Sequence, residues 1–178
     1  MIISPSIASS DVLYVADEVD FADKYFDDIH IDIEDIACDS RKVKPESLFV
    51  AIKGYDVDGH DYIEEAINKG AAAIIVENVE KLRNITLPPD VTFIVTKDTR
   101  YALAISSCNF YKNPSRKFKL IGVTGTKGKT TTTYMIKEIL EKAGHKVGLI
   151  GTIATYINGK MISESARTTP ESIELQKT

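Results

Sequence analysis

This 178-residue sequence has only two cysteines, a small net charge and few long apolar runs. The two cysteines, Cys38 and Cys108, are far apart and form no C-x-x-C pair, which favours small buried side chains over a disulfide or a zinc site. The formal net charge is −4, and acidic and basic residues are interleaved. This balance argues against a nucleic-acid partner, which would need a basic surface.

Signals for export or membrane insertion are missing as well. The opening stretch "MIISPSIASSDVLYVADEVDF" has no basic segment followed by a long apolar one, and no apolar run approaches the roughly 20 residues of a membrane span. We therefore expect a cytoplasmic protein without a membrane span. A hydrophobic content of 43% is sufficient for a packed core.

Apolar strand patterns alternate with helical patterns over residues 47–114, whereas the first 28 residues show no clear pattern. Residues 47–52, 72–77 and 91–96 are short apolar runs typical of buried strands. The segment "DTRYALAISSCNFYKNP" is a helix candidate that Asn113-Pro114 ends, because the residue before a proline resists helical geometry. This alternation predicts an α/β domain with a mostly parallel sheet covered by helices.

The helix expected between the first two strands has its own start and stop signals. Asp61, followed three residues later by Glu64, matches a capping box, and Gly70 ends the pattern. The apolar stripe of this helix consists of Ile63, Ala66 and Ile67. His60 is interpreted as a surface residue beside the cap rather than as a catalytic group.

A second unit begins near Ser115, and its main feature is the stretch "GVTGTKGKTTTT", residues 122–133. Residues 117–123 are expected to form a strand before the glycines, and residues 129–144 a helix after them. A glycine-rich loop between a strand and a helix is the context of a phosphate loop. The spacing departs from the standard G-x-x-x-x-G-K-[ST], because Val123 stands where the first glycine would be.

The helix after the loop has an apolar stripe at the helical period and a stop signal at Gly144. The stripe consists of Met135, Ile136, Ile139, Leu140 and Ala143. Residues 146–153, "KVGLIGTI", are then expected to return as a further strand.

The residue types of the loop suit the phosphates of ATP. Gly125 and Gly128 can adopt backbone angles closed to other residues, so that N–H groups and the helix start face a phosphate. Lys129 offers a positive charge to the β and γ phosphates, and Thr130 offers a hydroxyl to the magnesium ion that phosphoryl transfer needs. The alternative is a tight turn with capping threonines and no ligand.

On these residues the chain resembles the Mur ligase superfamily, whose shortened ATP loop reads T-G-T-[NK]-G-K-T-T. Residues 39–77 resemble the uridine-nucleotide-binding domain of its third-residue and terminal-dipeptide ligases. "GLIGTIATYINGK" and "ARTTPESIELQK" resemble the third-residue ligases. The resemblance implies a UDP-sugar-binding N-terminal domain over residues 1–115, followed by the first β-loop-α-β part of a P-loop central ATPase domain over residues 116–178.

The resemblance also implies roles for individual residues. The ATP-binding set is Gly125, Thr126, Lys127, Gly128, Lys129, Thr130 and Thr131, with Lys129 and Thr130 catalytic and Thr130 the magnesium ligand. The set that contacts the UDP-muramoyl-peptide is Cys38, Ser40, Tyr55, Asp56, Val57, Arg167, Thr168 and Thr169. Lys127 and Arg167 stand where relatives often carry asparagine, so their roles stay open.

The implied reaction is ATP- and magnesium-dependent amide formation in peptidoglycan synthesis. A γ-phosphoryl group passes to the carboxylate of UDP-N-acetylmuramoyl dipeptide, and an amino acid, either diaminopimelate or lysine, attacks the resulting acyl phosphate. The 178 residues would be the N-terminal part of such a ligase, inactive alone and prone to self-association. The alternatives are a non-catalytic nucleotide-sugar-binding module, the ligase that adds the terminal dipeptide, and a purely structural β-α-β domain.

Overall fold

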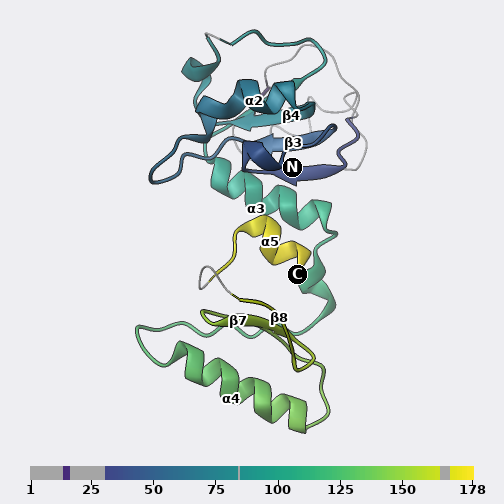
Figure 1. Ribbon diagram of the computed structural model, residues 1–178, viewed down its shortest axis with the longest axis vertical. Coiled ribbons are helices and arrows are strands. Elements are labelled where there is room, and N and C mark those ends of the chain that lie inside the picture. The colour runs from purple at the N-terminus through teal and green to yellow at the C-terminus, as the bar shows by residue number, and fades with distance from the viewer. Residues whose placement is uncertain (1–13, 17–30, 84, 165–168) are drawn as a thin grey trace. The chain divides into compact units, whose positions relative to one another are not determined.

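The chain divides into two compact units, Met1–Asn113 and Pro114–Thr178, and each has a sheet of its own (Figure 1). The computed structural model describes residues 14–16, 31–83, 85–164 and 169–178. Within these ranges no helix is both long enough and apolar enough to cross a membrane. The α/β class predicted from the sequence is confirmed.

A five-stranded parallel sheet forms the centre of the first unit, in the order β1-β5-β4-β3-β2. Its strands are β1 (Tyr14–Ala16), β2 (Asp35–Ala37), β3 (Ser47–Val50), β4 (Ala71–Val76) and β5 (Thr92–Thr96). Nearly all of β3 and β4 is buried, and parallel strands covered on both faces carry continuous apolar runs rather than alternating ones. The strands predicted at residues 47–52, 72–77 and 91–96 are confirmed.

Two helices cover opposite faces of this sheet (Figure 1). α2 (Ile63–Asn68) places the fully buried Ile63 in a cluster with Phe49 and Ile74. α3 (Thr99–Phe110) packs against β3 and β4 and buries Leu103 completely. Full burial of such a side chain stabilises the fold by about 1.5–3 kcal/mol, so packing on both faces of the sheet stabilises it.

The start of α2 differs from the predicted capping box. A 3₁₀ turn, Gly59–Tyr62, precedes the helix, and its cap is Asp58, which accepts a hydrogen bond from the His60 N–H at 3.0 Å. No side chain caps α2 itself. The capping box at Asp61 and Glu64 is wrong, because the extra turn moves the cap to Asp58 and leaves Asp61 to pair with Lys81.

The boundaries of α3 agree with the sequence pattern. Asp98 caps the helix by accepting a hydrogen bond from the Tyr101 N–H at 2.9 Å. After Phe110 the chain turns through Lys112 and Asn113, whose φ angles of 60° and 50° are incompatible with a continuing helix. The predicted helix end before Pro114 is confirmed.

The second unit combines one long helix with a three-stranded antiparallel sheet, β6-β7-β8. Its elements are α4 (Lys129–Lys142), β6 (Gly148–Ile150), β7 (Ala154–Ile157), β8 (Lys160–Glu164) and α5 (Ser172–Lys177). Asn158 and Gly159, with φ of 50° and 76°, make the tight turn between β7 and β8, a turn that requires positive φ at both positions. The helix predicted over residues 129–144 and the strand predicted within residues 146–153 are confirmed.

Residues 117–123 do not form the predicted strand. Pro114–Lys117 is a 3₁₀ turn, and no described strand pairs with the residues that follow. Leu120 and Ile121 are 76% and 56% exposed. An apolar run becomes a strand only where a neighbouring strand accepts its backbone hydrogen bonds, and β6–β8 pair with one another instead.

The predicted apolar stripe of α4 is not its packed face. Met135 and Ile139 are exposed, whereas the Lys137 side chain is only 8% exposed. Lys137 lies over the ring of Tyr156 on β7, and the Tyr134 ring meets the same ring edge-on at 5.8 Å. Helical periodicity identified the apolar stripe, but it could not show that the sheet lies against a neighbouring stripe.

Candidate functional site

The glycine-rich loop has the open backbone that a phosphate would need. Gly125 and Gly128 have φ of +146° and +80°, a region that side chains rarely adopt. Gly128 is the N-cap of α4, and no side chain caps this helix. A Cβ added at Gly128 would meet nothing within 4 Å, so the approach to the first turn of α4 is unobstructed. Backbone N–H groups and the positive end of the helix dipole therefore face the opening.

Lys129 folds back over this loop. Its ammonium donates a hydrogen bond to the Gly125 carbonyl oxygen, and the Nζ–O distance is 2.6 Å. Thr130 is half-buried in the first turn of α4, and its own carbonyl accepts a hydrogen bond from the Thr133 hydroxyl at 2.9 Å. Thr126, Lys127 and Thr131 are exposed. The residues predicted to bind ATP are thus consecutive in the chain and all at least partly exposed, before and within the first turn of α4.

This loop offers a magnesium ion one hydroxyl oxygen as a ligand, but not a complete set of protein ligands. The part of the chain that the structure describes holds no group of three or more His, Cys, Asp or Glu side chains placed to bind a metal. Magnesium is commonly held by one or two protein oxygens together with substrate phosphates. The Thr130 hydroxyl fits that pattern.

In the first unit, a short hairpin follows β3 and carries Tyr55, Asp56 and Val57 at its tip. The Gly54 N–H donates to the Val57 carbonyl at 2.8 Å, and the Gly59 N–H donates to the Ile52 carbonyl at 2.9 Å. The Tyr55 side chain is fully exposed, and Val57 is 52% exposed. The hairpin leaves the sheet at the carboxyl end of a parallel strand, the edge where open α/β sheets bind ligands.

The second candidate segment follows β2 at the same edge. Asp39 caps the 3₁₀ turn Ser40–Lys42 and also accepts two hydrogen bonds from the Arg41 guanidinium, at 2.9 and 2.8 Å. These side-chain bonds from Arg41 lower the pKa of Asp39 from 3.8 to about 2. Cys38 and Ser40 are therefore brought to the edge of the sheet that also carries the hairpin after β3.

Ser40 is already engaged inside the protein. Its hydroxyl donates to Glu65 Oε2 at 2.7 Å, and its carbonyl accepts from Lys69 Nζ at 2.9 Å. Lys69 also donates to Glu65 Oε1 at 2.7 Å, and the bonds from Lys69 and then from Ser40 lower the pKa of Glu65. A ligand at Ser40 would therefore meet the lone pairs of the hydroxyl, because its proton points to Glu65. No sequence pattern pointed to Glu65 and Lys69, which lie on α2 and at its C-cap.

Of the predicted threonine pair, Thr169 is exposed after β8. Arg167 and Thr168 lie outside the described residues, as do residues 1–13 and 17–30.

His60 is buried, so its interpretation as a surface residue is wrong. Only 2% of the residue is exposed. Its Nδ1 lies 2.7 Å from Asp58 Oδ1, and its Nε2 accepts a hydrogen bond from the Glu77 N–H at 3.1 Å. The 3₁₀ turn after Asp58 turns the ring inward, and no local sequence pattern could reveal a partner 17 residues away.

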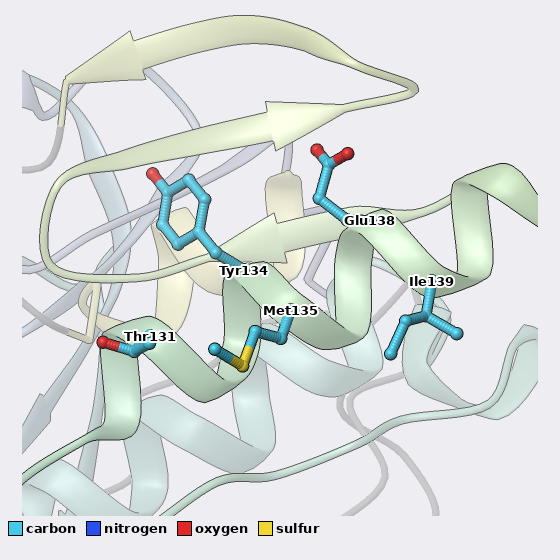
Figure 2. Close-up of a pocket in the computed structure, with 5 residues that line it drawn as sticks. All are labelled: Thr131, Tyr134, Met135, Glu138 and Ile139. Atoms are coloured by element: carbon cyan, nitrogen blue, oxygen red, sulfur yellow. The ribbon is translucent and has the colours of Figure 1, made fainter.

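An apolar hollow of about 420 Å³ runs along α4 (Figure 2). It is lined by Thr131, Tyr134, Met135, Glu138 and Ile139. All five side chains come from a single helix, and Figure 2 shows them spread along it rather than converging on an enclosed space. Met135 and Ile139 are exposed here, whereas Tyr134 packs against Tyr156 of β7, and the polar groups that would orient a small ligand are few.

Comparisons with known proteins match both units. The Mur ligase family, catalytic domain, matches residues 32–111, and the Mur ligase middle domain matches residues 123–178. The UDP-N-acetylmuramoyl-L-alanyl-D-glutamate--2,6-diaminopimelate ligase of Clostridium botulinum is 57% identical over 146 residues, covering 82% of this chain and 30% of the relative. Ligase 1 of that name from Clostridium acetobutylicum is 53% identical over 150 residues, covering 84% of this chain and 30% of the relative.

A solved structure of a ligase with the same description superposes with a TM-score of 0.59. It is 21% identical and covers 86% of this chain and 29% of that chain, so it supports the fold alone. The chain spans about 30% of the length of the curated relatives it matches.

The parallel sheet of the first unit, with helices on both of its faces, defines an α/β protein. Within that class, the chain belongs to the Mur ligase family. This family uses ATP.

Proposed function

We propose that this chain supplies the nucleotide-sugar-binding and ATP-phosphate-binding parts of a cytoplasmic ligase of the Mur family. The ligase would add diaminopimelate to UDP-N-acetylmuramoyl-L-alanyl-D-glutamate, the reaction named in the relatives that are 57% and 53% identical. Residues 1–115 would form the nucleotide-sugar domain, and residues 116–178 would begin the ATP-binding domain. The observation that carries the proposal is the open loop at the uncapped start of α4, with Gly128 at a φ of +80°.

The ATP-binding part works through charge and backbone donors. An incoming phosphate would take the Lys129 ammonium away from the Gly125 carbonyl, so the lysine exchanges one acceptor for a charged and stronger one. N–H groups at the start of α4 would donate to the phosphate oxygens. When bound, magnesium would be held by the Thr130 hydroxyl together with phosphate oxygens, and it would neutralise charge on the transferring group.

The nucleotide-sugar part is the edge formed by the turn at Ser40 and the hairpin at Tyr55. The exposed Tyr55 ring offers a face on which a base can stack, and the exposed Asp56 carboxylate can accept hydrogen bonds from sugar hydroxyls. While the Ser40 hydroxyl donates to Glu65, it can accept a hydrogen bond from a ligand but cannot donate one. These groups bind and orient the substrate.

In the proposed reaction, the dipeptide carboxylate attacks the γ-phosphorus of ATP, and ADP leaves. The amine of diaminopimelate then attacks the acyl carbon, phosphate leaves, and the amine loses a proton. Lys129 holds the phosphates in line, while the nucleotide-sugar edge fixes the carboxylate donor.

Two measurements test this proposal. Calorimetric titration of the 178-residue chain with UDP-N-acetylmuramoyl-L-alanyl-D-glutamate and with Mg-ATP measures the two binding steps separately. Binding of the first ligand alone would favour a non-catalytic nucleotide-sugar module.

The second measurement uses a chimera in which residues 32–178 replace the matching segment of the Clostridium botulinum ligase. We expect the chimera to keep adding diaminopimelate to UDP-N-acetylmuramoyl-L-alanyl-D-glutamate, because residues 32–178 would supply the binding of both nucleotides. A chimera that folds but binds neither UDP-N-acetylmuramoyl-L-alanyl-D-glutamate nor Mg-ATP would overturn the assignment. The unmodified ligase serves as the control.

A further inference from the structure

His60 joins two segments at the base of the Tyr55 hairpin. One ring nitrogen, Nδ1, faces Asp58 Oδ1 at 2.7 Å, at the end of the hairpin. The other, Nε2, faces the backbone N–H of Glu77 at 3.1 Å and that of Asn78 at 3.4 Å, just after β4. The His60 side chain is almost completely buried, with 1% of its surface exposed.

These partners fix the tautomer and leave the ring no free nitrogen. A backbone amide can only donate, so Nε2 must accept, and the proton of the neutral ring must then sit on Nδ1 and point at Asp58. Both ring nitrogens of His60 are therefore used within the protein. An acid–base role in the reaction would require breaking one of these bonds, whereas a holding role uses both.

The opposite side of the hairpin base is held by α3. The Glu77 carboxylate accepts from the Thr99 N–H at 3.2 Å and from the Thr99 hydroxyl at 2.9 Å, which ties the end of β4 to the start of α3. The next residue, Arg100, donates to the Lys53 carbonyl at 3.3 Å. Lys53 and Asp58 face one another as the two sides of the hairpin base. Both sides are thus bound to β4 or α3, while the tip stays free.

Asp58 is the charged partner in this arrangement. Burial alone would raise its pKa, but the hydrogen bonds from the His60 backbone and ring, with the nearby Lys81 charge, together lower the pKa below its usual value. Lys81 Nζ lies 3.7 Å from Asp58 Oδ2. Asp58 therefore stays ionised as the acceptor for the ring N–H.

We propose that His60 is a positioning residue, which holds the Tyr55–Val57 hairpin in place for the nucleotide-sugar by bonding to Asp58 on one side and to the end of β4 on the other. This inference rests on the proposed function of the hairpin. A hairpin whose base is fixed loses little conformational entropy when a ligand orders its tip, whereas a loose one lowers the apparent affinity by the fraction of time it is misplaced.

Two variants separate the two bonds. The amide of Asn in His60→Asn lies near the Nδ1 position, where it can donate to Asp58, but is too short to reach the Glu77 N–H. The longer side chain in His60→Gln brings its amide oxygen near the Nε2 position, where it can accept from Glu77, and leaves the Nδ1 position empty. His145→Gln, at an exposed position in the second unit, is the matched control. Hydrogen exchange is measured at the Gly54 and Gly59 amides, whose acceptors lie within the hairpin, and at the Ile74 amide in the core. The affinity for UDP-N-acetylmuramoyl-L-alanyl-D-glutamate is measured by calorimetry on the same samples.

We expect protection of the Gly54 and Gly59 amides to fall about tenfold more than that of Ile74, and the dissociation constant to rise about tenfold, in both His60 variants. Equal losses at hairpin and core, with unchanged affinity of the folded fraction, would overturn the positioning role and leave a purely structural one. If the unaltered chain binds no nucleotide-sugar, the proposed function fails. The exchange pattern still decides whether His60 holds the hairpin, so the two failures are distinguishable.

Discussion

The Lys129 ammonium lies 2.6 Å from the carbonyl oxygen of Gly125, across a loop with no side chain at either glycine. The lysine is therefore held over the space where we propose that phosphate binds. Since the bond is to a neutral carbonyl, a phosphate oxygen is a better acceptor for the same ammonium. The relationship explains how the loop keeps its cation in place without a carboxylate that would compete for it.

Replacing Lys129 with alanine should weaken Mg-ATP binding at least tenfold, because a hydrogen bond to a charged group is typically worth about 1.5–3 kcal/mol. Calorimetry at constant ionic strength measures the effect. Lys146→Ala, which removes an exposed lysine beyond the end of α4, is the control for net charge. Equal ATP affinity in both variants would mean that the loop is only a structural turn.

Replacing Tyr55 with alanine should leave stability within about 0.5 kcal/mol, because the side chain is fully exposed. The same change should weaken nucleotide-sugar binding by about 1–3 kcal/mol, the usual worth of one stacked base. Tyr55→Phe keeps the ring and should restore most of the affinity. Denaturation in urea and calorimetry with UDP-N-acetylmuramoyl-L-alanyl-D-glutamate give the two quantities. A phenylalanine variant as weak as the alanine one would transfer the role from the ring to the hydroxyl.

Local patterns predicted the regular elements of the fold well. β3 and β4 were visible as continuous apolar runs, because both of their faces are covered. The Gly144 stop gave the end of α4. The turn at Asn158-Gly159 also carried a strong hairpin signal, which the strand-and-helix alternation obscured. Elements whose own residues carry the pattern could therefore be predicted from the sequence.

Features that depend on a partner far away in the sequence could not be predicted from it. Residues 117–123 have the composition of a strand, but no described strand pairs with them. The histidine at position 60 looked like a surface residue because its two partners, Asp58 and the amide of Glu77, meet only in the folded sheet. Similarly, the bond from Ser40 to Glu65 spans 25 residues. Composition predicted which residues gather at the sheet edge, but not how their hydrogen bonds are shared.

Acidification should remove the contribution of Asp39 to stability. Its pKa is about 2 in the folded protein, against an ordinary value of 3.8. The charged carboxylate therefore stabilises the fold at pH values above 3.8, and this stabilisation is lost as the pH falls towards 2. Arg41 is 82% exposed, so solvent screening keeps the effect small. Thermal unfolding of the unaltered chain and of Asp39→Asn, compared between pH 5 and pH 2, should show a difference that shrinks with acid. A constant difference would contradict the ion pair as its source.

Replacing Gly59 with alanine should open the base of the Tyr55 hairpin. A Cβ at this position would lie 2.7 Å from both the N and the O atoms of Ile52, closer than side chains and backbone can approach. The Gly59 N–H also donates to that same oxygen, so the clash and the hydrogen bond cannot both persist. Forcing extra volume into a packed site typically costs about 1–3 kcal/mol, and we expect a loss in this range in urea denaturation.

The control for this change is Gly151→Ala, where an added Cβ would meet nothing within 4 Å. If the hairpin binds the nucleotide-sugar, Gly59→Ala should also lower the affinity of the folded protein, whereas Gly151→Ala should not. A stable Gly59→Ala variant with full affinity would show that the hairpin base can shift without consequence, and the bracing by His60 and Arg100 would then be irrelevant to binding.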